Sequence, residues 1–476
     1  MCGIIGEISR QGTNVTGDIY SRLSQLQHRG QEAAGIYVSD PHTGVLHERK
    51  GQGLVNVVFQ DGELLSKFDG TMALGHVRYS TTLDKDVAQP FSTSFGEIML
   101  AHNGQVANEP QLRAQLDRKN RSCKTGCDAE VLLRVFEYYF DDRRGETVER
   151  VFRSVEKLMQ VTTGAYSVVA GINGEGLLAF RDPHGIRPLV YGRSEDRYVF
   201  ASETVALDGL QDVQTVKLGE AIFVDNDLNV SKRIISQGQP AHCFFEWDYF
   251  AHVDSDIEGI YVHSVRKRLG IELAHEFEKN ARTRLESHVL SLRQSYPNIE
   301  VLVSPVPETA RPAAESFARE TGFNHRAFLI KDRYSNRTFI QPTQQKREAG
   351  VKKIRVLSQV IRGNIALIKD DSIVRGTSSR ELVQAVRDAG AVGVYWGSTC
   401  PPIKFPCPCG IDFHTTEELI AANRSEEEVG RIIGADVLTY NTLDGLVAAI
   451  GKRKDQLCLG CLTGEYPASL EMEVEL

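Results

Sequence analysis

The sequence contains no long hydrophobic run and no strong excess of charge of either sign, and we expect no signal peptide at its start. Its 476 residues include 55 Lys plus Arg and 63 Asp plus Glu, which gives a formal net charge of −8. A mildly acidic chain lacks the excess of positive charge with which proteins bind DNA or RNA, so neither is expected as a principal partner. No stretch approaches the roughly 18 uninterrupted apolar residues of a membrane span, and the first residues lack the basic and apolar regions of a leader. We therefore expect a cytoplasmic protein that binds neither a nucleic acid nor a membrane.

Internal repeats and low-complexity tracts are also missing from the sequence. Apolar residues make up 41% and charged residues 25% of the chain, which is ordinary for a globular enzyme. At about 150 residues per domain, the length predicts two to four domains, each able to bury a core.

Cysteine is sparse and unevenly placed. Nine cysteines in a chain of this length are too few for a disulfide scaffold, and their number is odd. In a reducing compartment, grouped cysteines are more often catalytic or metal-binding than bridged. Cys2 and Cys243 stand alone, and the others form three groups, which are Cys123 with Cys127, Cys400 with Cys407 and Cys409, and Cys458 with Cys461.

The first half of the chain consists of short β-prone runs separated by Gly, Asp and Asn turns. Because these strands and the helical patterns between them fall in segregated runs, we expect an α+β layered domain. The predicted strands span 3–9, 35–39, 98–101, 167–173, 176–181 and 197–202, and the predicted helices span 18–27, 130–139 and 148–161.

After Cys243 the pattern changes to alternating strands and helices, which predicts an α/β domain with a parallel sheet. We place the boundary between 235 and 255, with one domain over 2–240 and the other over 255–476. The second domain is predicted to begin with one long helix over 262–290, followed by strands over 300–304, 365–369 and 392–397 and by helices over 310–321 and 378–389.

Cys2 is a candidate nucleophile because it directly follows the initiator methionine. Removal of Met1 leaves an N-terminal cysteine whose own α-amino group, with a pKa of roughly 7.7–8, can act as the base. The alternative is a buried strand cysteine, and Cys2 taken alone favours that alternative.

Other residues supply what an amide substrate requires. Arg78 can pair with an α-carboxylate and Asp128 with an α-ammonium group. The Asn103 side-chain amide and the Gly104 backbone N–H can form an oxyanion hole. Each of these residues alone is more typical of a solvated turn. Their combination favours a site for an amide substrate with Cys2 as its nucleophile.

The segments 2–4, 26–32, 75–81 and 102–104, which read Cys-Gly-Ile, Leu-Gln-His-Arg-Gly-Gln-Glu, Gly-His-Val-Arg-Tyr-Ser-Thr and His-Asn-Gly, resemble the glutaminase domain of the N-terminal-nucleophile amidotransferases. The resemblance implies a four-layered α-β-β-α sandwich. It also implies that Cys2 attacks the side-chain amide of glutamine and releases ammonia, with Arg78, Thr81 and Asp128 binding the glutamine.

A second motif lies over 366–379, where a strand leads into two adjacent carboxylates, a loop of small residues and a helix start. Asp370 and Asp371 can contact ribose hydroxyls or hydrated Mg²⁺. The following helix start, with Thr377 and Ser378, can hold a phosphate. A solvated acidic turn is a reasonable alternative for the two aspartates alone and a poor one for the whole run.

This run resembles the signature of the type I phosphoribosyltransferases, which bind phosphoribosyl pyrophosphate (PRPP). Together with the first motif, it makes the chain from Cys2 to about Tyr466 similar to the amidophosphoribosyltransferase family. Such an enzyme converts PRPP, glutamine and water to 5-phosphoribosylamine, glutamate and pyrophosphate at the start of de novo purine biosynthesis. The resemblance further implies a homotetramer and feedback inhibition by purine nucleotides. It implies that Thr309, Asp370 and Asp371 bind Mg²⁺ and that PRPP is bound by Arg337, Lys353, Asp370, Asp371, Ser372, Arg375, Gly376, Thr377 and Ser378.

The later cysteines match a cluster site in one branch of that family. From spacing alone, a zinc site with four cysteines is equally compatible, because the C-x-x-C pair suits both metals. The resemblance favours a [4Fe–4S] cluster held by Cys243, Cys407, Cys458 and Cys461, and it assigns no role to Cys400 or Cys409.

Several positions depart from the family pattern. Glu308 and Ala310 stand in the pyrophosphate loop, Asp332 replaces an asparagine, Lys369 replaces an aliphatic residue, and the loop over 347–353 is one residue short. These departures leave open a paralogue with a working glutaminase and an altered acceptor half. A non-catalytic sensor that binds PRPP or a nucleotide is a third possibility, although a sensor has no use for the glutaminase residues.

Overall fold

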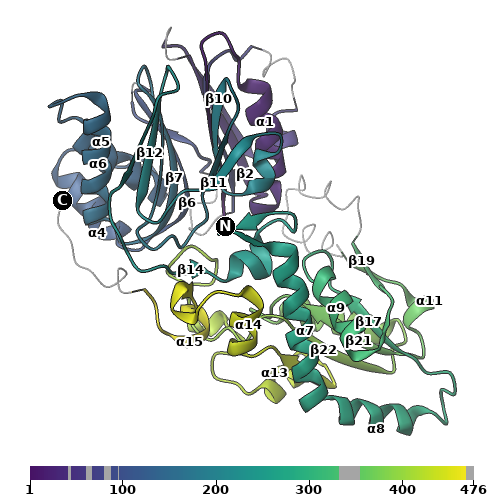
Figure 1. Ribbon diagram of the computed structural model, residues 1–476. Helices are drawn as coiled ribbons and strands as arrows, with labels where there is room; N and C mark the ends of the chain where they lie inside the picture. Colours follow the sequence, from purple (N-terminus) through teal and green to yellow (C-terminus); the bar gives the residue numbers. More distant parts are fainter. Residues whose placement is uncertain (41–43, 61–66, 80–86, 95, 332–353, 468–476) are drawn as a thin grey trace.

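The computed structural model describes residues 1–40, 44–60, 67–79, 87–94, 96–331 and 354–467 (Figure 1). Among the helices of these residues, none has both the length and the hydropathy of a membrane span. Thr81, Asp332, Arg337, Lys353 and the loop over 347–353 lie outside the described residues.

Two antiparallel sheets lie face to face in the first half of the chain, with helices on both outer sides, as Figure 1 shows. The seven-stranded sheet has the order β11 (Gln211–Thr215), β9 (Val190–Arg193), β10 (Arg197–Ala201), β1 (Gly3–Ser9), β4 (Met72–Arg78), β2 (Ala33–Ser39) and β3 (Leu46–Gln52). The six-stranded sheet has the order β13 (Val230–Ile234), β12 (Glu220–Asp225), β8 (Gly176–Arg181), β7 (Gly164–Ile172), β6 (Ile98–Val106) and β5 (Phe91–Ser92).

Successive side chains of each strand point to opposite faces of its sheet, so the apolar residues of this half form three core layers. Ile4 and Ile8 of β1 face the second sheet and pack in the core between the sheets. Ile5 faces the other way, into the core shared with the helices of its own sheet. Helices α1 (Thr16–Gln25) and α2 (Val55–Val58) cover the seven-stranded sheet, and α4 (Glu109–Arg118), α5 (Asp128–Phe140) and α6 (Thr147–Val161) cover the other. The predicted α-β-β-α sandwich is confirmed.

The second half contains a five-stranded sheet whose neighbouring strands are all parallel, which confirms the predicted α/β architecture. The order is β18 (Asn324–His325), β17 (Val301–Pro305), β21 (Ile365–Asp370), β22 (Gly393–Ser398) and β23 (Val437–Tyr440). Helices α7 (Val262–Asn280) and α9 (Arg311–Thr321) cover one face, and α12 (Thr377–Asp388) and α13 (Glu426–Ile433) cover the other.

The predicted single helix over 262–290 is wrong, because the chain forms two helices there. Helix α7 ends at Asn280, Ala281 has φ −126° and ψ −22°, and α8 (Arg282–Leu292) follows. Most of the buried residues of α7 lie on one apolar stripe, whereas Leu285 is the one buried residue of α8. The second helix therefore leaves the core, and Figure 1 shows it running across the end of α7.

The segment around the predicted boundary is exposed or half-buried over 235–240 and buried over 241–248. Strand β14 (His242–Cys243) pairs in parallel with β24 (Leu457–Cys458), and a π-helical turn, η3, follows at Glu246–Phe250. One hydrophobic cluster includes Ala165 and Ile186 of the first half and residues of the second half up to Leu462. The domain limits 2–240 and 255–476 stay a prediction.

The remaining described elements are short or peripheral. They are η1 (Gln27–Arg29), η2 (Thr204–Leu207), β15 (Asp256–Ile257), β16 (Ile260–Tyr261), β19 (Leu329–Lys331), β20 (Ile354–Val356), α11 (Ser358–Ile361), η5 (Thr416–Glu418), α14 (Leu443–Ile450), η6 (Lys454–Gln456) and α15 (Gly460–Thr463).

Candidate active site

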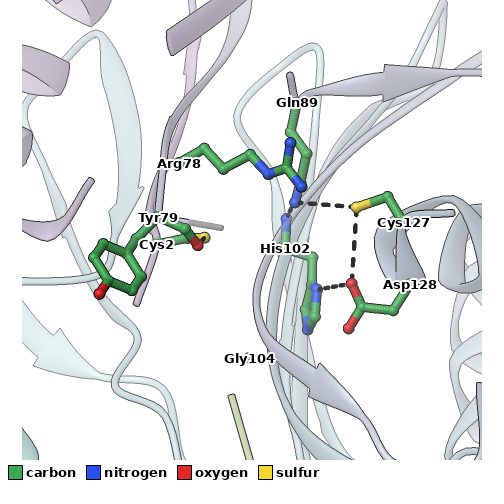
Figure 2. Close-up of a pocket in the computed structure, with 8 residues that line it drawn as sticks. All are labelled: Cys2, Arg78, Tyr79, Gln89, His102, Gly104, Cys127 and Asp128. Atoms are coloured by element: carbon green, nitrogen blue, oxygen red, sulfur yellow. Dashed lines mark hydrogen bonds and ion pairs between the residues drawn. The ribbon is translucent and has the colours of Figure 1, made fainter. Parts of the chain in front are cut away.

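A pocket opens beside Cys2 where the two antiparallel sheets meet α5 (Figure 2). Cys2 directly precedes β1, and Gly3 pairs with Val77 near the end of β4, so the nucleophile lies next to the end of that strand. The pocket is lined by Cys2, Arg78, Tyr79, Gln89, His102, Gly104, Cys127 and Asp128.

Three hydrogen bonds fix Cys2 from different elements. Its backbone nitrogen donates to Asn103 Oδ1 at 3.2 Å, and its thiol approaches the Tyr79 carbonyl oxygen at 3.6 Å. Its carbonyl oxygen accepts from Arg29 Nε at 2.9 Å. Met1 is buried, and this burial lowers the pKa of its amine to about 5. The nitrogen that becomes the α-amine of Cys2 after removal of Met1 is therefore already held by Asn103.

The two predicted oxyanion donors lie beside this nucleophile. The Asn103 side chain is fully buried, and its amide nitrogen has no hydrogen-bond partner among the described residues. Gly104 has φ +145°, and a Cβ at this position would lie 1.9 Å from the Ala165 carbonyl oxygen. Only glycine fits that backbone. An unpaired buried donor next to a nucleophile is what an oxyanion hole requires.

Arg78 and Asp128 bring opposite charges to the same pocket, as Figure 2 shows. Arg78 is buried at the end of β4 and donates to the Val87 carbonyl oxygen. Asp128 is the first residue of α5; one of its oxygens accepts from Val106 N at 3.0 Å, and the other lies 3.8 Å from His102 Nδ1. The pair matches the carboxylate and ammonium groups of a zwitterionic amino acid.

Four further pocket residues were given no role by the sequence. Gln89 Oε1 accepts from the His102 backbone N–H at 2.9 Å, and Gln89 Nε2 faces the Cys127 sulfur at 3.9 Å. Burial lowers the pKa of the His102 ring, which keeps it neutral near pH 7. Tyr79 and His102 belong to segments that carried the resemblance, whereas no motif marked Gln89 or Cys127.

The acidic pair lies at the carboxyl edge of the parallel sheet. Strand β21 ends at Asp370, which is level with Ser398 at the end of β22. Asp371 N donates to Asp370 Oδ1 at 3.0 Å, and Ser372 Oγ donates to Asp371 Oδ1 at 2.9 Å. Burial, and next the neighbouring Asp371, raise the pKa of Asp370, while burial raises the pKa of Asp371 to about 6. Two crowded carboxylates at this edge suit a divalent cation.

The helix start that follows is open to a phosphate. Gly376 is the N-cap of α12, and Thr377 and Ser378, its first two residues, are exposed. Arg375 donates to the Glu418 carboxylate and, at 3.0 Å, to the Asp412 carbonyl oxygen. The helix start that the sequence predicts as a phosphate site is therefore exposed, and Arg375 is held by Glu418 and Asp412.

The departures in the pyrophosphate loop fit the conformation that it adopts. Ala310 has φ −78° and ψ 0°, an ordinary conformation for any residue, so no glycine is needed there. Glu308 is exposed and pairs with Arg311 at 2.7 Å. Thr309, which lies between Glu308 and Ala310 in the sequence, is half-buried at the end of the loop after β17.

The side chain of Lys369 points into the core under α7 and α9 rather than toward the acidic pair. Its amine nitrogen lies 3.7 Å from the centre of the Phe317 ring.

Two contacts join the Cys2 pocket to the second half of the chain. The Tyr79 hydroxyl lies near the Asp412 carboxylate, and burial, followed by the charge of Asp412, raises the pKa of Tyr79. Asp412 also lies 3.9 Å from Arg375. Gly410 packs directly on Gly104, since a Cβ on Gly410 would lie 2.8 Å from the Gly104 backbone.

The four predicted cluster cysteines gather in one buried region. Cys243 and Cys458 are paired residues of β14 and β24, and Cys461 interacts electrostatically with both of them and with Cys407. Buried thiols are suitable ligands for an iron–sulfur cluster or zinc. Within the described part of the chain, however, no three His, Cys, Asp or Glu side chains have the spacing of a metal site. The four thiols fit a cluster or zinc by their chemistry, but the described side chains are not placed as a metal site.

Comparisons with known proteins cover nearly the whole chain. A family model described as a glutamine amidotransferase domain matches residues 76–209. The chain is 38% identical to an amidophosphoribosyltransferase of Methanothermobacter thermautotrophicus, over 99% of the chain and 96% of the relative. It is 40% identical to that of Methanocaldococcus jannaschii, over 99% of both.

Solved structures agree with these relatives. A glutamine PRPP amidotransferase from Bacillus subtilis, complexed with ADP and GMP, superimposes with a TM-score of 0.82 at 37% identity and covers 98% of this chain and 97% of that one. A structure described as the allosteric regulatory enzyme of purine biosynthesis gives a TM-score of 0.81 at 36% identity, over 98% of this chain and 96% of that one.

Proposed function

Since the chain belongs to the amidophosphoribosyltransferase family, we propose that its Cys2 pocket and its acidic pair carry out the two halves of that family's reaction. The enzyme is a glutamine-dependent pentosyltransferase. It converts PRPP, glutamine and water to 5-phosphoribosylamine, glutamate and pyrophosphate, the first committed step of purine biosynthesis. The observation that carries the assignment of roles is the placing of Cys2, Arg78 and Asp128 around one pocket.

In the first half-reaction, Arg78 and Asp128 orient glutamine so that its side-chain amide faces Cys2. The Cys2 thiol attacks the amide carbon, and its α-amine, freed by loss of Met1 and held by Asn103, takes the thiol proton. Asn103 and Gly104 stabilise the oxyanion, the amine returns the proton to the leaving ammonia, and water then hydrolyses the glutamyl thioester. Thr81 is a further proposed glutamine-binding residue.

In the second half-reaction, ammonia replaces pyrophosphate at C1 of the ribose. Ser372, Gly376, Thr377 and Ser378 surround the helix start that would bind the 5-phosphate. Arg375, Arg337 and Lys353 are proposed to bind PRPP by charge and positioning. Thr309, Asp370 and Asp371 would hold Mg²⁺, which when bound supplies positive charge to the departing pyrophosphate.

Cys243, Cys407, Cys458 and Cys461 are proposed to hold a [4Fe–4S] cluster. The chemistry of the four thiols and the burial of Cys243, Cys407 and Cys461 support this proposal, and zinc stays the alternative that the C-x-x-C pair in the sequence allows. When bound, such a cluster would cross-link β14, β24 and the segment around Cys407 in one core.

Regulation and assembly are proposals of the same kind. The Bacillus subtilis structure contains ADP and GMP, which supports feedback inhibition of this enzyme by purine nucleotides. A homotetramer and a cytoplasmic location are proposed from the family resemblance.

The altered-acceptor paralogue and the non-catalytic sensor are not favoured. The relatives match over both halves of the chain, and the exposed position of Glu308 and the ordinary conformation of Ala310 support a working pyrophosphate loop.

The test of the function measures glutamate and pyrophosphate release by anaerobically purified protein with glutamine and Mg²⁺, with and without PRPP. We expect equal release of both products, dependent on PRPP and absent in Cys2→Ala. Glutamate release without pyrophosphate would instead indicate an altered acceptor half.

A further inference from the structure

Asp248 is a buried acid that the reaction proposed above does not use. It lies in η3 and is 1% exposed. Its Oδ1 accepts from the Thr399 hydroxyl at 2.9 Å, whereas its Oδ2 has no hydrogen-bond partner in the described part of the chain. Burying a carboxyl group with one oxygen unpaired is costly, so we expect this side chain to do more than fill space.

Thr399 connects this acid to the backbone of the acidic pair. Its backbone N–H donates to the Asp370 carbonyl oxygen at 3.0 Å, and its hydroxyl lies 3.2 Å from the Asp371 carbonyl oxygen. The N–H of Cys400 donates to the same Asp371 oxygen at 2.8 Å. The loop after β22 therefore holds the turn that carries both carboxylates, and Asp248 fixes the side chain of Thr399 in that loop.

The position of Asp248 is itself fixed by a buried arginine of α7. Arg266 Nε donates to the Trp247 carbonyl oxygen at 3.0 Å, and Arg266 Nη2 donates to those of Tyr249 at 3.0 Å and Ala251 at 2.8 Å. These bonds lie on both sides of Asp248 and hold the backbone of η3 against α7. The carboxyl group of Asp248 is therefore a rigid partner for the loop after β22.

From these contacts we propose that Asp248 is a positioning residue of the second site, which acts through Thr399 to hold Asp370 and Asp371 in the geometry that binds PRPP with Mg²⁺. The inference rests on the function proposed above for the acidic pair. Loss of a group that orients the ligands of a metal typically changes metal affinity or activity by about 10–100-fold. The alternative is that Asp248 only ties η3 to the loop after β22, in which case its loss would change stability and leave PRPP binding unchanged.

The test measures PRPP binding by full-length protein that is purified anaerobically. Isothermal titration calorimetry with PRPP and Mg²⁺, in the absence of glutamine, gives the Kd without turnover. Wild type is compared with Asp248→Leu, Thr399→Val and the double variant, which remove the hydrogen bond from one side, from the other and from both. Circular dichroism and the melting temperature verify that every variant is folded.

Two further variants separate positioning from packing. Asp248→Asn keeps an oxygen that can accept from Thr399. Burial, followed by the charge of Asp371, raises the pKa of Asp248 to about 8, so this variant also changes the charge little near pH 7. Thr321→Val is the matched control, because Thr321 is likewise buried and its hydroxyl donates to the Phe317 carbonyl oxygen within α9.

We expect the Kd for PRPP to rise about 10–100-fold in Asp248→Leu and in Thr399→Val, with no further rise in the double variant because both changes break one bond. Asp248→Asn should bind PRPP nearly as tightly as wild type, and Thr321→Val should keep the wild-type Kd with a lower melting temperature. A wild-type Kd in Asp248→Leu, multiplied effects in the double variant, or an Asp248→Asn protein as weak as Asp248→Leu would each overturn the proposal. Wild-type protein that binds no PRPP would instead overturn the proposed function itself, which separates the two failures.

Discussion

Lys369 is a single buried lysine whose charge lowers the stability of the folded protein. The amine of Lys369 lies among aromatic rings, 3.7 Å from the centre of Phe317 and 5.3 Å from that of Phe277. Cation–π contact compensates only part of the lost hydration, and burial lowers the pKa of Lys369 to about 7. An aliphatic residue at this position would avoid that cost.

We predict that Lys369→Met raises the free energy of unfolding, most strongly below pH 7. The pKa of this lysine is about 7 in the fold against the ordinary value of 10.5, so the penalty for burying its charge is complete below pH 7. It is relieved as the pH rises toward 10.5, because only the unfolded chain still binds the proton there. The gain should be on the order of 2–4 kcal/mol at pH 6 and much smaller at pH 10.

Urea unfolding at both pH values measures this gain. Lys267→Met, at an exposed position of α7, is the matched control and should change stability little at either pH. An equal gain at pH 6 and pH 10 for Lys369→Met would contradict the assignment to charge burial.

Asn103 carries the second prediction at this scale. Asn103→Ala removes a hydrogen-bond donor that stabilises the oxyanion mainly in the transition state. The kcat for glutamate release should therefore fall by about 10²–10³-fold. The KM for glutamine should change much less, because Arg78 and Asp128 bind the substrate.

Asn108→Ala is the control for this variant. Asn108 is also a buried asparagine, but both ends of its side chain bond the backbone, at Val161 O and Thr163 N. Its loss should lower the melting temperature with little effect on kcat. A rise in KM with kcat unchanged in Asn103→Ala would rule out the oxyanion role.

The site residues that could be predicted from the sequence are those whose functional groups lie within one short, recognisable segment. Asn103 and Gly104 are neighbours, and Asp128 begins a helix whose pattern was clear. Gln89 could not be found in this way, because its function is to accept the His102 N–H across 13 positions. Such a contact depends on how β6 packs against the segment of Gln89, and the spacing of residues within one segment does not show this.

At the scale of elements, buried strands were predicted well and a helix break was not. The strands over 3–9 and 176–181 match β1 and β8, because fully buried apolar runs bounded by turn residues are a strong signal. The break at Ala281 has no Gly or Pro to mark it. It is set by packing, since α7 follows the sheet and α8 does not.

The loop at Gly410 gives a prediction for contact between elements. Gly410→Ala places a methyl group 2.8 Å from the backbone of Gly104 at a residue with φ +96°. Since this backbone cannot rotate away like a side chain, the oxyanion strand must shift. We expect kcat for glutamate release to fall at least about tenfold, because a displacement near 1 Å at a catalytic group costs that much or more.

Gly451→Ala separates this contact from backbone strain. Gly451 has φ +82°, and a methyl group added there would have no atom of the described residues within 4 Å, so the variant carries only the strain of about 1–2 kcal/mol. Both variants should lower the melting temperature, but only Gly410→Ala should slow glutamate release. Equal activities in the two would show that Gly410 does not support the oxyanion strand.

At the scale of the whole molecule, a buried ion network joins the two halves. The Arg29 guanidinium donates to both carboxylate oxygens of Glu246 at 3.0 Å and also to Glu203. Arg187 lies 3.6 Å from Glu246. Arg29 and Glu246 are 217 positions apart. Both belong to segments that could be recognised in the sequence, but an ion pair over such a separation could not be predicted from either segment. Through Arg29 the network also reaches the carbonyl of Cys2.

We predict that Glu246→Gln destabilises the whole chain by about 3–5 kcal/mol, because it leaves buried guanidinium groups of Arg29 and Arg187 short of a counter-charge. The hydrophobic cluster that spans both halves should make urea unfolding one transition that shifts as a unit. Glu286→Gln removes an exposed partner of Arg282 and should change stability by less than about 1 kcal/mol. If Glu246→Gln instead split the unfolding into two transitions, the ion network, and not the shared apolar core, would be what makes the two halves unfold together.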